Sequence, residues 1–155
     1  MESGISVGIR GSYLMAKADE LTFTEFSSIN SRLRQVSDTW ADLWVTIYYT
    51  KINVGKLLVL RFEDVTESDL PLKKNEIIHL LAANPVRHII QKRRSLYPND
   101  EFIFQSHSNR VKSIAKPVTV VAFNQALRDS AKYVTDKNIS SNSARRVQNI
   151  IHKVA

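Results

Sequence analysis

The chain has 155 residues, 43% of them hydrophobic, which is enough for one folded domain with a core and argues against disorder. It contains no cysteine, which excludes disulfides and thiolate metal sites, and its four histidines lack ligand spacing, so we expect no metal or other cofactor. The net charge of +7 is uneven, since residues 1–76 hold nine Lys/Arg and eleven Asp/Glu whereas residues 77–155 hold thirteen and four. The second half is therefore expected to face an anionic partner, unless the surplus lysines only keep the domain soluble.

Residues 1–18 contain three glycines and no sustained period, which predicts a flexible leader or arm ahead of a domain over residues 19–155. This segment has no signal-peptide pattern. The longest apolar runs of the chain are far shorter than the roughly 20 residues that cross a bilayer. We therefore predict a cytoplasmic protein without a membrane segment.

The first two helices carry clear start signals. Thr22 and Glu25 in 21-LTFTEF-26 form a capping box, and Leu21 with Phe26 forms a hydrophobic staple. A second helix is expected after a cap at Ser37 or Asp38, with apolar residues at offsets of three and four. Its two tryptophans, Trp40 and Trp44, are expected in the core rather than stacked on bases.

The middle of the chain predicts shorter elements. Residues 56–65 read as a short buried helix that ends near Phe62, and residues 66–83 read as two strands joined by a turn with Lys73 and Lys74 at its tip. Asn84-Pro85 opens a helix whose basic run 92-KRR-94 is expected to face solvent.

The last third predicts a strand, a polar loop and two helices. The strand is 102-FIF-104, and the loop bears Arg110, Lys112 and Lys116. Thr119 is expected to cap a helix over residues 120–134, and a final helix buries Ala144, Val147, Ile151 and Val154. The fold class is therefore α+β, mainly α, with a small antiparallel hairpin or sheet.

Several short segments occur in an order that carries information: 21-LTFTE-25, 50-TKINVGKLLVLRFED-64, the lysines at 73 and 74, 102-FIF-104 and 142-NSARR-146. In this order they resemble the catalytic domain of the tyrosine recombinases, the phage integrase family, over residues 20–155. The second segment is similar to the family's Thr-Gly-Leu-Arg-x-x-Glu-Leu-Leu-x-Leu-Arg-Trp-x-Asp. The last is similar to its His-x-Leu-Arg-His box, or the variant His-Ser-Ala-Arg-Lys.

The resemblance implies a site for DNA cleavage, but several of its positions differ. Asn53 stands at the family's first arginine and Asn142 at its first box histidine, while Arg145 keeps the second arginine's place and Lys73 or Lys74 that of the hairpin lysine. Arg145 and Lys73 are thus expected to be vestigial catalytic residues. The family's nucleophilic tyrosine has no counterpart in register before the last residue, 155. Loss of one charged donor alone costs about 3–4 kcal/mol of transition-state stabilisation, so we expect no strand cleavage.

The leading hypothesis is a protein that binds double-stranded DNA and is accessory or regulatory in a mobile element or plasmid. The expected backbone contacts are Lys73, Lys74, Arg110, Lys112, Lys116, Arg128, Arg145 and Arg146. Sequence preference should be weak unless the helix at residues 119–134 presents Asn124, Gln125 or Arg128 to a major groove. About six neutralised phosphates would give a slope of roughly −5 for log affinity against log salt.

Two other functions remain open at this point. One is a truncated or split recombinase that a missing C-terminal segment completes. The other is a module that docks on an active recombinase, or on a copy of itself, through a groove that would receive a C-terminal tail.

Simpler roles are also open for single residues. Arg145 could pair with Asp136 on the surface. Lys73 and Lys74 could be a solvated turn. Asn53 could simply cap a helix that begins at Val54.

Overall fold

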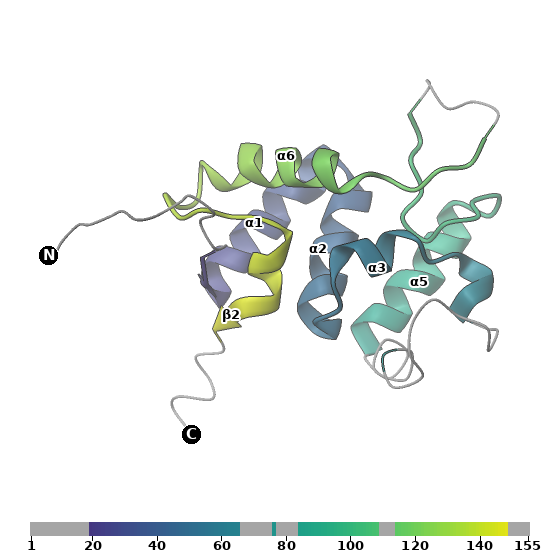
Figure 1. The fold of residues 1–155 in the computed structure, drawn as a ribbon, viewed down its shortest axis with the longest axis horizontal. Helices are drawn as coiled ribbons and strands as arrows, with labels where there is room; N and C mark the ends of the chain where they lie inside the picture. The colour runs from purple at the N-terminus through teal and green to yellow at the C-terminus, as the bar shows by residue number, and fades with distance from the viewer. Residues whose placement is uncertain (1–18, 66–75, 77–83, 109–113, 149–155) are drawn as a thin grey trace, which may run out of the picture.

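The computed structural model describes residues 19–65, 76, 84–108 and 114–148, and this part of the chain is mainly helical (Figure 1). Its α-helices are α1 (Phe23–Val36), α2 (Asp38–Thr50), α3 (Val54–Leu58), α5 (Asn84–Leu96) and α6 (Val120–Ala131). Two 3-10 helices, η1 (Phe62–Val65) and η2 (Ser141–Arg146), and two short strands, β1 (Leu21–Thr22) and β2 (Val147–Gln148), complete it. The expected leader, residues 1–18, lies outside the described residues.

Helix α1 begins where the capping box places it. The Thr22 hydroxyl accepts from the Glu25 amide at 3.1 Å, and the Glu25 carboxylate accepts from the Thr22 amide at 3.0 Å. These two bonds satisfy backbone donors that have no partner inside the helix. Leu21 and Phe26, the expected staple pair, are both buried in the core.

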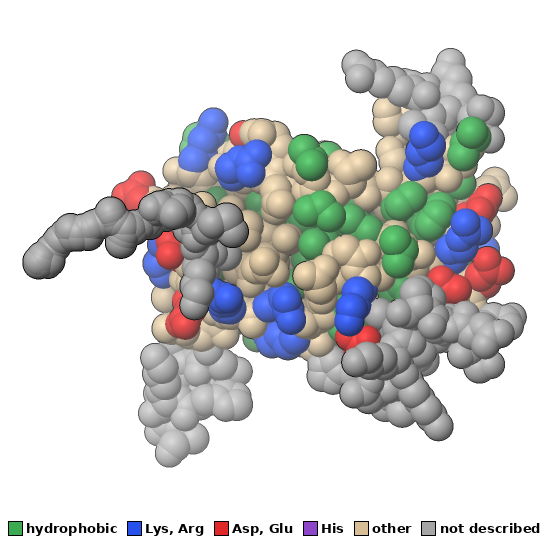
Figure 2. Space-filling model, in the orientation of Figure 1, with side chains coloured by type: hydrophobic (Ala, Val, Ile, Leu, Met, Phe, Trp, Pro, Cys, Tyr) green, Lys and Arg blue, Asp and Glu red, His purple; other side chains and the backbone are tan. Residues whose placement is uncertain are grey.

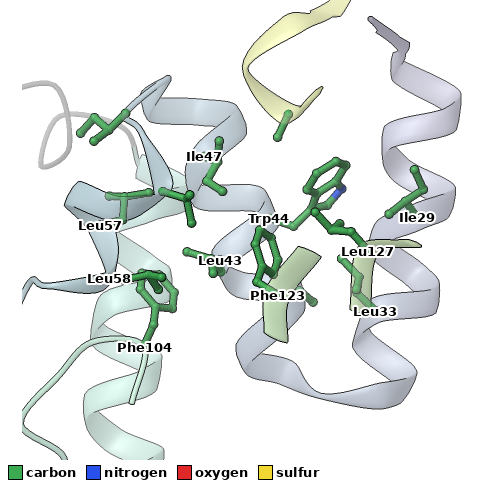
Figure 3. Packing of buried hydrophobic residues seen from close by; sticks show 14 of the residues in the cluster. Ile29, Leu33, Leu43, Trp44, Ile47, Leu57, Leu58, Phe104, Phe123 and Leu127 are labelled. Carbon is green, nitrogen blue, oxygen red and sulfur yellow. The ribbon is translucent and has the colours of Figure 1, made fainter. Parts of the chain in front are cut away.

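Helix α2 lies at the centre of the fold, with α1 on one side, α3 and α5 on the other, and α6 across the top of the view (Figure 1). The Ser37 hydroxyl caps it by accepting from the Thr39 amide, as expected. Its Trp44 is fully buried, stacks on Phe26, packs beside Phe123 (Figure 3) and donates its indole N–H to the Phe26 carbonyl at 3.1 Å. Trp40 is partly buried against the same cluster, so both tryptophans serve the core.

The sheet of the described residues differs from the expected one. Strands β1 and β2 pair in parallel, with Leu21 opposite Val147 and Thr22 opposite Gln148. A final helix through Val147 was therefore a wrong prediction, because the chain leaves η2 in extended form to pair with the N-terminal strand. Ile151 and Val154 lie outside the described residues, as do residues 66–75 and 77–83 of the predicted hairpin. Glu76, expected in the turn of that hairpin, is helical.

The segment 102-FIF-104 is buried as predicted, but it does not form a strand. Phe102 makes only an isolated antiparallel bridge with Arg61, and a second bridge joins Gln105 to Pro117. An apolar run specifies burial, whereas a strand also needs a partner with several successive backbone groups free. Thr119 caps α6 as expected, although α6 ends at Ala131 rather than at residue 134.

The basic run 92-KRR-94, expected to face solvent, does so only in part. Arg94 is exposed and Lys92 is half-buried, but the prediction was wrong for Arg93. Arg93 is fully buried and donates to the Asp42 carboxylate at 3.0 Å, to the Thr39 hydroxyl at 2.8 Å and to the Ile103 carbonyl at 2.8 Å. Lys92 also contacts Asp42, at 3.1 Å. A buried charge must be paired and hydrogen-bonded, and Asp42 on α2 makes this possible for α5.

None of the helices in the described part of the chain has both the length and the apolar character of a membrane-spanning segment.

Candidate anion-binding pocket

A polar surface pocket of about 340 Å³ lies where the end of α2, the start of α3 and η2 meet. Its lining residues come from two segments that are distant in the sequence, and they are Lys51, Asn53, Asn142, Arg145 and Arg146. Four of these five were predicted site residues. The fold thus brings together the two degenerate positions, Asn53 and Asn142, and the two arginines of the last motif.

Asn53 has a structural role that fixes its place in the pocket. Its side-chain oxygen accepts from the Gly55 amide at 2.8 Å, so it caps α3, which begins at Val54. Asparagine is among the best residues at this position, and its replacement by alanine typically costs about 1 kcal/mol. The simpler role that the sequence left open is therefore confirmed, and Asn53 also lines the pocket.

Lys51 precedes Asn53 and closes α2 in an unusual backbone conformation. Its φ is 59°, which makes it the one residue other than glycine with positive φ in the described chain. Its amide donates to the Ile47 carbonyl at 2.8 Å, which completes the end of α2. A left-handed residue commonly ends a helix, but glycine normally fills that position because a Cβ is strained there.

Helix η2 places the arginines by means of its own caps. The Ser140 and Ser143 hydroxyls form a reciprocal capping box at its start, and Ser143 and Ala144 are fully buried. The side-chain oxygen of Asn124 on α6 accepts from the Ser141 amide at 3.0 Å. Asn124 therefore anchors η2, and its carbonyl oxygen is committed to that bond rather than to a base edge in a major groove.

Arg145 is joined to the end of α2. Its Nε donates to the Lys51 carbonyl at 2.9 Å, which leaves the rest of the guanidinium at the pocket. Among the described residues it forms no ion pair with Asp136, so that alternative does not hold. A guanidinium bound through Nε to a fixed carbonyl keeps a defined orientation and can still donate from its terminal nitrogens.

The electrostatics of the pocket favour an anion. It is lined by three cations and two neutral amides, and none of the described lining residues is acidic. Basic side chains follow the lower part of the face in Figure 2, near the region of η2 and the lower ends of α2 and α3 in Figure 1. Such a set of donors can hold the oxygens of a phosphate through charge-assisted hydrogen bonds.

The Lys51 ammonium is partly withdrawn from water. It lies 4.4 Å from the centre of the Tyr48 ring, and burial lowers the pKa of Lys51 from its ordinary value although the residue as a whole is exposed. Lys51 was not among the predicted site residues. The available signal was its position in 50-TKIN-53, where the recombinase motif has glycine.

The remaining predicted contacts do not line this pocket. Arg128 lines a separate pocket with Lys132 and Lys137, and its guanidinium donates to Gln125 at 2.9 Å. Lys116 is exposed on the segment that leads into α6. Lys73, Lys74, Arg110 and Lys112 lie outside the described residues. Within the described chain, no group of three His, Cys, Asp or Glu side chains could hold a metal ion.

No protein-family model, curated protein or solved structure matches this chain. The function therefore has to be inferred from the chemistry of the pocket.

Proposed function

We propose that this protein binds the sugar-phosphate backbone of double-stranded DNA without cleaving it, on a fold related to the tyrosine recombinase catalytic domain, as an accessory or regulatory protein of a mobile element or plasmid. The observation that carries the proposal is the convergence of Asn53 and Asn142 with Arg145 and Arg146 in one cationic pocket. These are the positions at which the resemblance puts the phosphate-binding groups of a recombinase. Residues so far apart in sequence have no local reason to meet.

The backbone at Lys51 is compatible with the resemblance. In the recombinase motif Thr-Gly-x-Arg, glycine stands two residues before the first arginine, and this chain has Lys51 in the matching place before Asn53. Lys51 adopts the left-handed conformation that glycine would adopt without strain. A glycine in this place would fit the observed backbone, which is compatible with the motif.

The two asparagines are the reason to propose binding without cleavage. The Asn53 oxygen is committed to the Gly55 amide, which leaves a neutral NH₂ group where the reaction needs a cation. Asn142 is also neutral, so it cannot supply a charged or titrating group at the position of the family's first box histidine. A phosphate can be held by the remaining cations, but the charge that develops during cleavage would be poorly stabilised.

A salt series with Arg145→Ala tests the proposal. We expect the wild-type protein to bind a short duplex with affinity that falls steeply with salt, and the variant to bind about tenfold more weakly, with a slope about 0.9 shallower. The matched control is Arg61→Ala, which removes an exposed arginine already paired with Glu101 and Glu63. It should change affinity less than about twofold.

Two results would contradict the proposal. A flat salt response would show that DNA phosphates are not the ligand. Equal affinities for Arg145→Ala and wild type would show that the pocket is not the site. A covalent protein-DNA adduct on a nicked suicide substrate would instead support the alternative of a split recombinase, and we expect no such adduct.

A further inference from the structure

We propose that Lys51 supplies the positive charge for the bound phosphate that Asn53, at the first arginine position, cannot supply. The inference rests on the proposed function, because it assigns a role within the same pocket. It goes beyond that function because the resemblance gives this position no part in binding. In this chain Asn53 caps α3, and Lys51, two residues earlier, would carry the charge.

The backbone of Lys51 is held at both of its polar groups. The amide donates to the Ile47 carbonyl at 2.8 Å, and the carbonyl accepts from Arg145 at 2.9 Å. With φ fixed at 59°, the side chain leaves the end of α2 in a direction that a right-handed residue would not give it. Lys51 lines the pocket together with Asn53 and Arg145.

A lysine in this conformation is costly where glycine would fit. Residues other than glycine in left-handed conformations persist where the surroundings impose them, and such positions are enriched at functional sites. The contact between the Lys51 ammonium and the Tyr48 ring, 4.4 Å from its centre, accounts for part of the compensation. It does not account for the position of three cations around a pocket with no acid among its described lining residues.

A phosphate would complete this arrangement. Burial lowers the pKa of Lys51 because it disfavours the charged form, and a nearby anion favours that form. Arg145 is already oriented by the Lys51 carbonyl, so one phosphate could contact the lysine and the arginine without rearrangement of the backbone. Lys51 would thus have two tasks, to orient Arg145 through its carbonyl and to bind the ligand through its side chain.

The test compares Lys51→Gly, Lys51→Asn and Lys51→Arg on a short duplex over a salt series. Glycine and asparagine both accept the left-handed conformation and keep the carbonyl, so Arg145 stays in place while the charge and its contact with the Tyr48 ring are lost. We expect both to bind about five to ten times more weakly, with the salt slope about 0.9 shallower, while their melting temperatures stay at or above that of the wild type. Lys51→Arg should keep most of the affinity.

A second comparison asks whether Lys51 replaces the missing arginine. Asn53→Arg should raise affinity more in the Lys51→Gly background than in the wild type, because the two cations would serve the same phosphate. Equal gains in both backgrounds would overturn the idea of replacement.

The outcomes separate this inference from the proposed function. Wild-type affinity in Lys51→Gly, together with weaker binding by Arg145→Ala, would overturn the role of Lys51 and leave DNA binding in place. No salt-dependent DNA binding by the wild type would refute both. Weaker binding with a lowered melting temperature in both Lys51→Gly and Lys51→Asn would show that the side chain is structural, and would also overturn the inference.

Discussion

The buried carboxylate of Asp42 is the clearest place to test how this fold is stabilised. Asp42 is fully buried on α2 and accepts from Arg34, Lys92 and Arg93, at 3.1, 3.1 and 3.0 Å. Substitution Asp42→Asn keeps the size of the side chain and removes its charge. It also turns one acceptor into an NH₂ group that faces guanidinium donors.

The cost follows from what remains around Arg93. That guanidinium is fully buried, and the next carboxylate among the described residues, Asp38, is 3.8 Å away. Removing one partner of a buried pair typically costs about 3–5 kcal/mol, because the other charge stays in a poorly solvating environment. Domains of this size are stable by about 5–15 kcal/mol, so the variant should lose a large fraction of its stability and melt roughly 10 °C lower.

Urea unfolding followed by tryptophan fluorescence measures the loss directly, since Trp44 is buried. The control is Lys92→Ala, which removes a partly exposed partner of the same carboxylate and should cost at most about 1 kcal/mol. If Asp42→Asn changed the free energy of unfolding by less than about 1 kcal/mol, the ion pair between Asp42 and Arg93 would not be what stabilises the buried guanidinium.

Two further variants test the pocket and the first cap. Asn53→Asp keeps the cap on the Gly55 amide but places a negative charge among the pocket cations. Stability in urea should hold or rise, whereas DNA affinity should fall more than about tenfold. Unchanged affinity would exclude a phosphate at this pocket. Burial alone would raise the pKa of Glu25, but hydrogen bonds from Lys137, Thr22 and Thr135 outweigh it and lower the pKa from 4.5 to about 2. This stabilisation is complete above pH 4.5 and is lost as pH falls toward 2, so Glu25→Gln should flatten the stability profile in that range by about 1 kcal/mol, and a parallel profile would be inconsistent with it.

Features that depend on neighbouring residues were predictable from the sequence. The side chains of Thr22, Ser37 and Thr119 were each expected to cap a helix. Each accepts a hydrogen bond from a backbone amide two or three residues later, so all three caps are formed. The burial of Trp44, Phe123 and Leu127 follows from helical spacing in the same way. These local signals fixed where α1, α2 and α6 begin.

Features that depend on distant partners were not predictable. Arg93 looked solvent-facing because its neighbours are basic, and its burial depends on Asp42, which lies 51 positions away. Strand β2 exists because residues after η2 meet Leu21 at the other end of the described chain. The pocket was predictable only in part, because the motif comparison named Asn53, Asn142, Arg145 and Arg146 but did not single out Lys51.

The two ends of α2 contact two groups of Lys and Arg side chains that differ in their partners. Near its first turn, Asp42 forms ion pairs with Arg34, Lys92 and Arg93, so these cations serve stability. At its other end the Arg145 guanidinium donates to the carbonyl of Lys51, the residue that closes the helix, and a helix C-terminus favours cations by its partial negative charge. Under the proposed function, Arg145 and Lys51 at this end of the helix bind a phosphate. A count of lysines and arginines cannot separate these two groups, whereas the end of α2 that each cation contacts does.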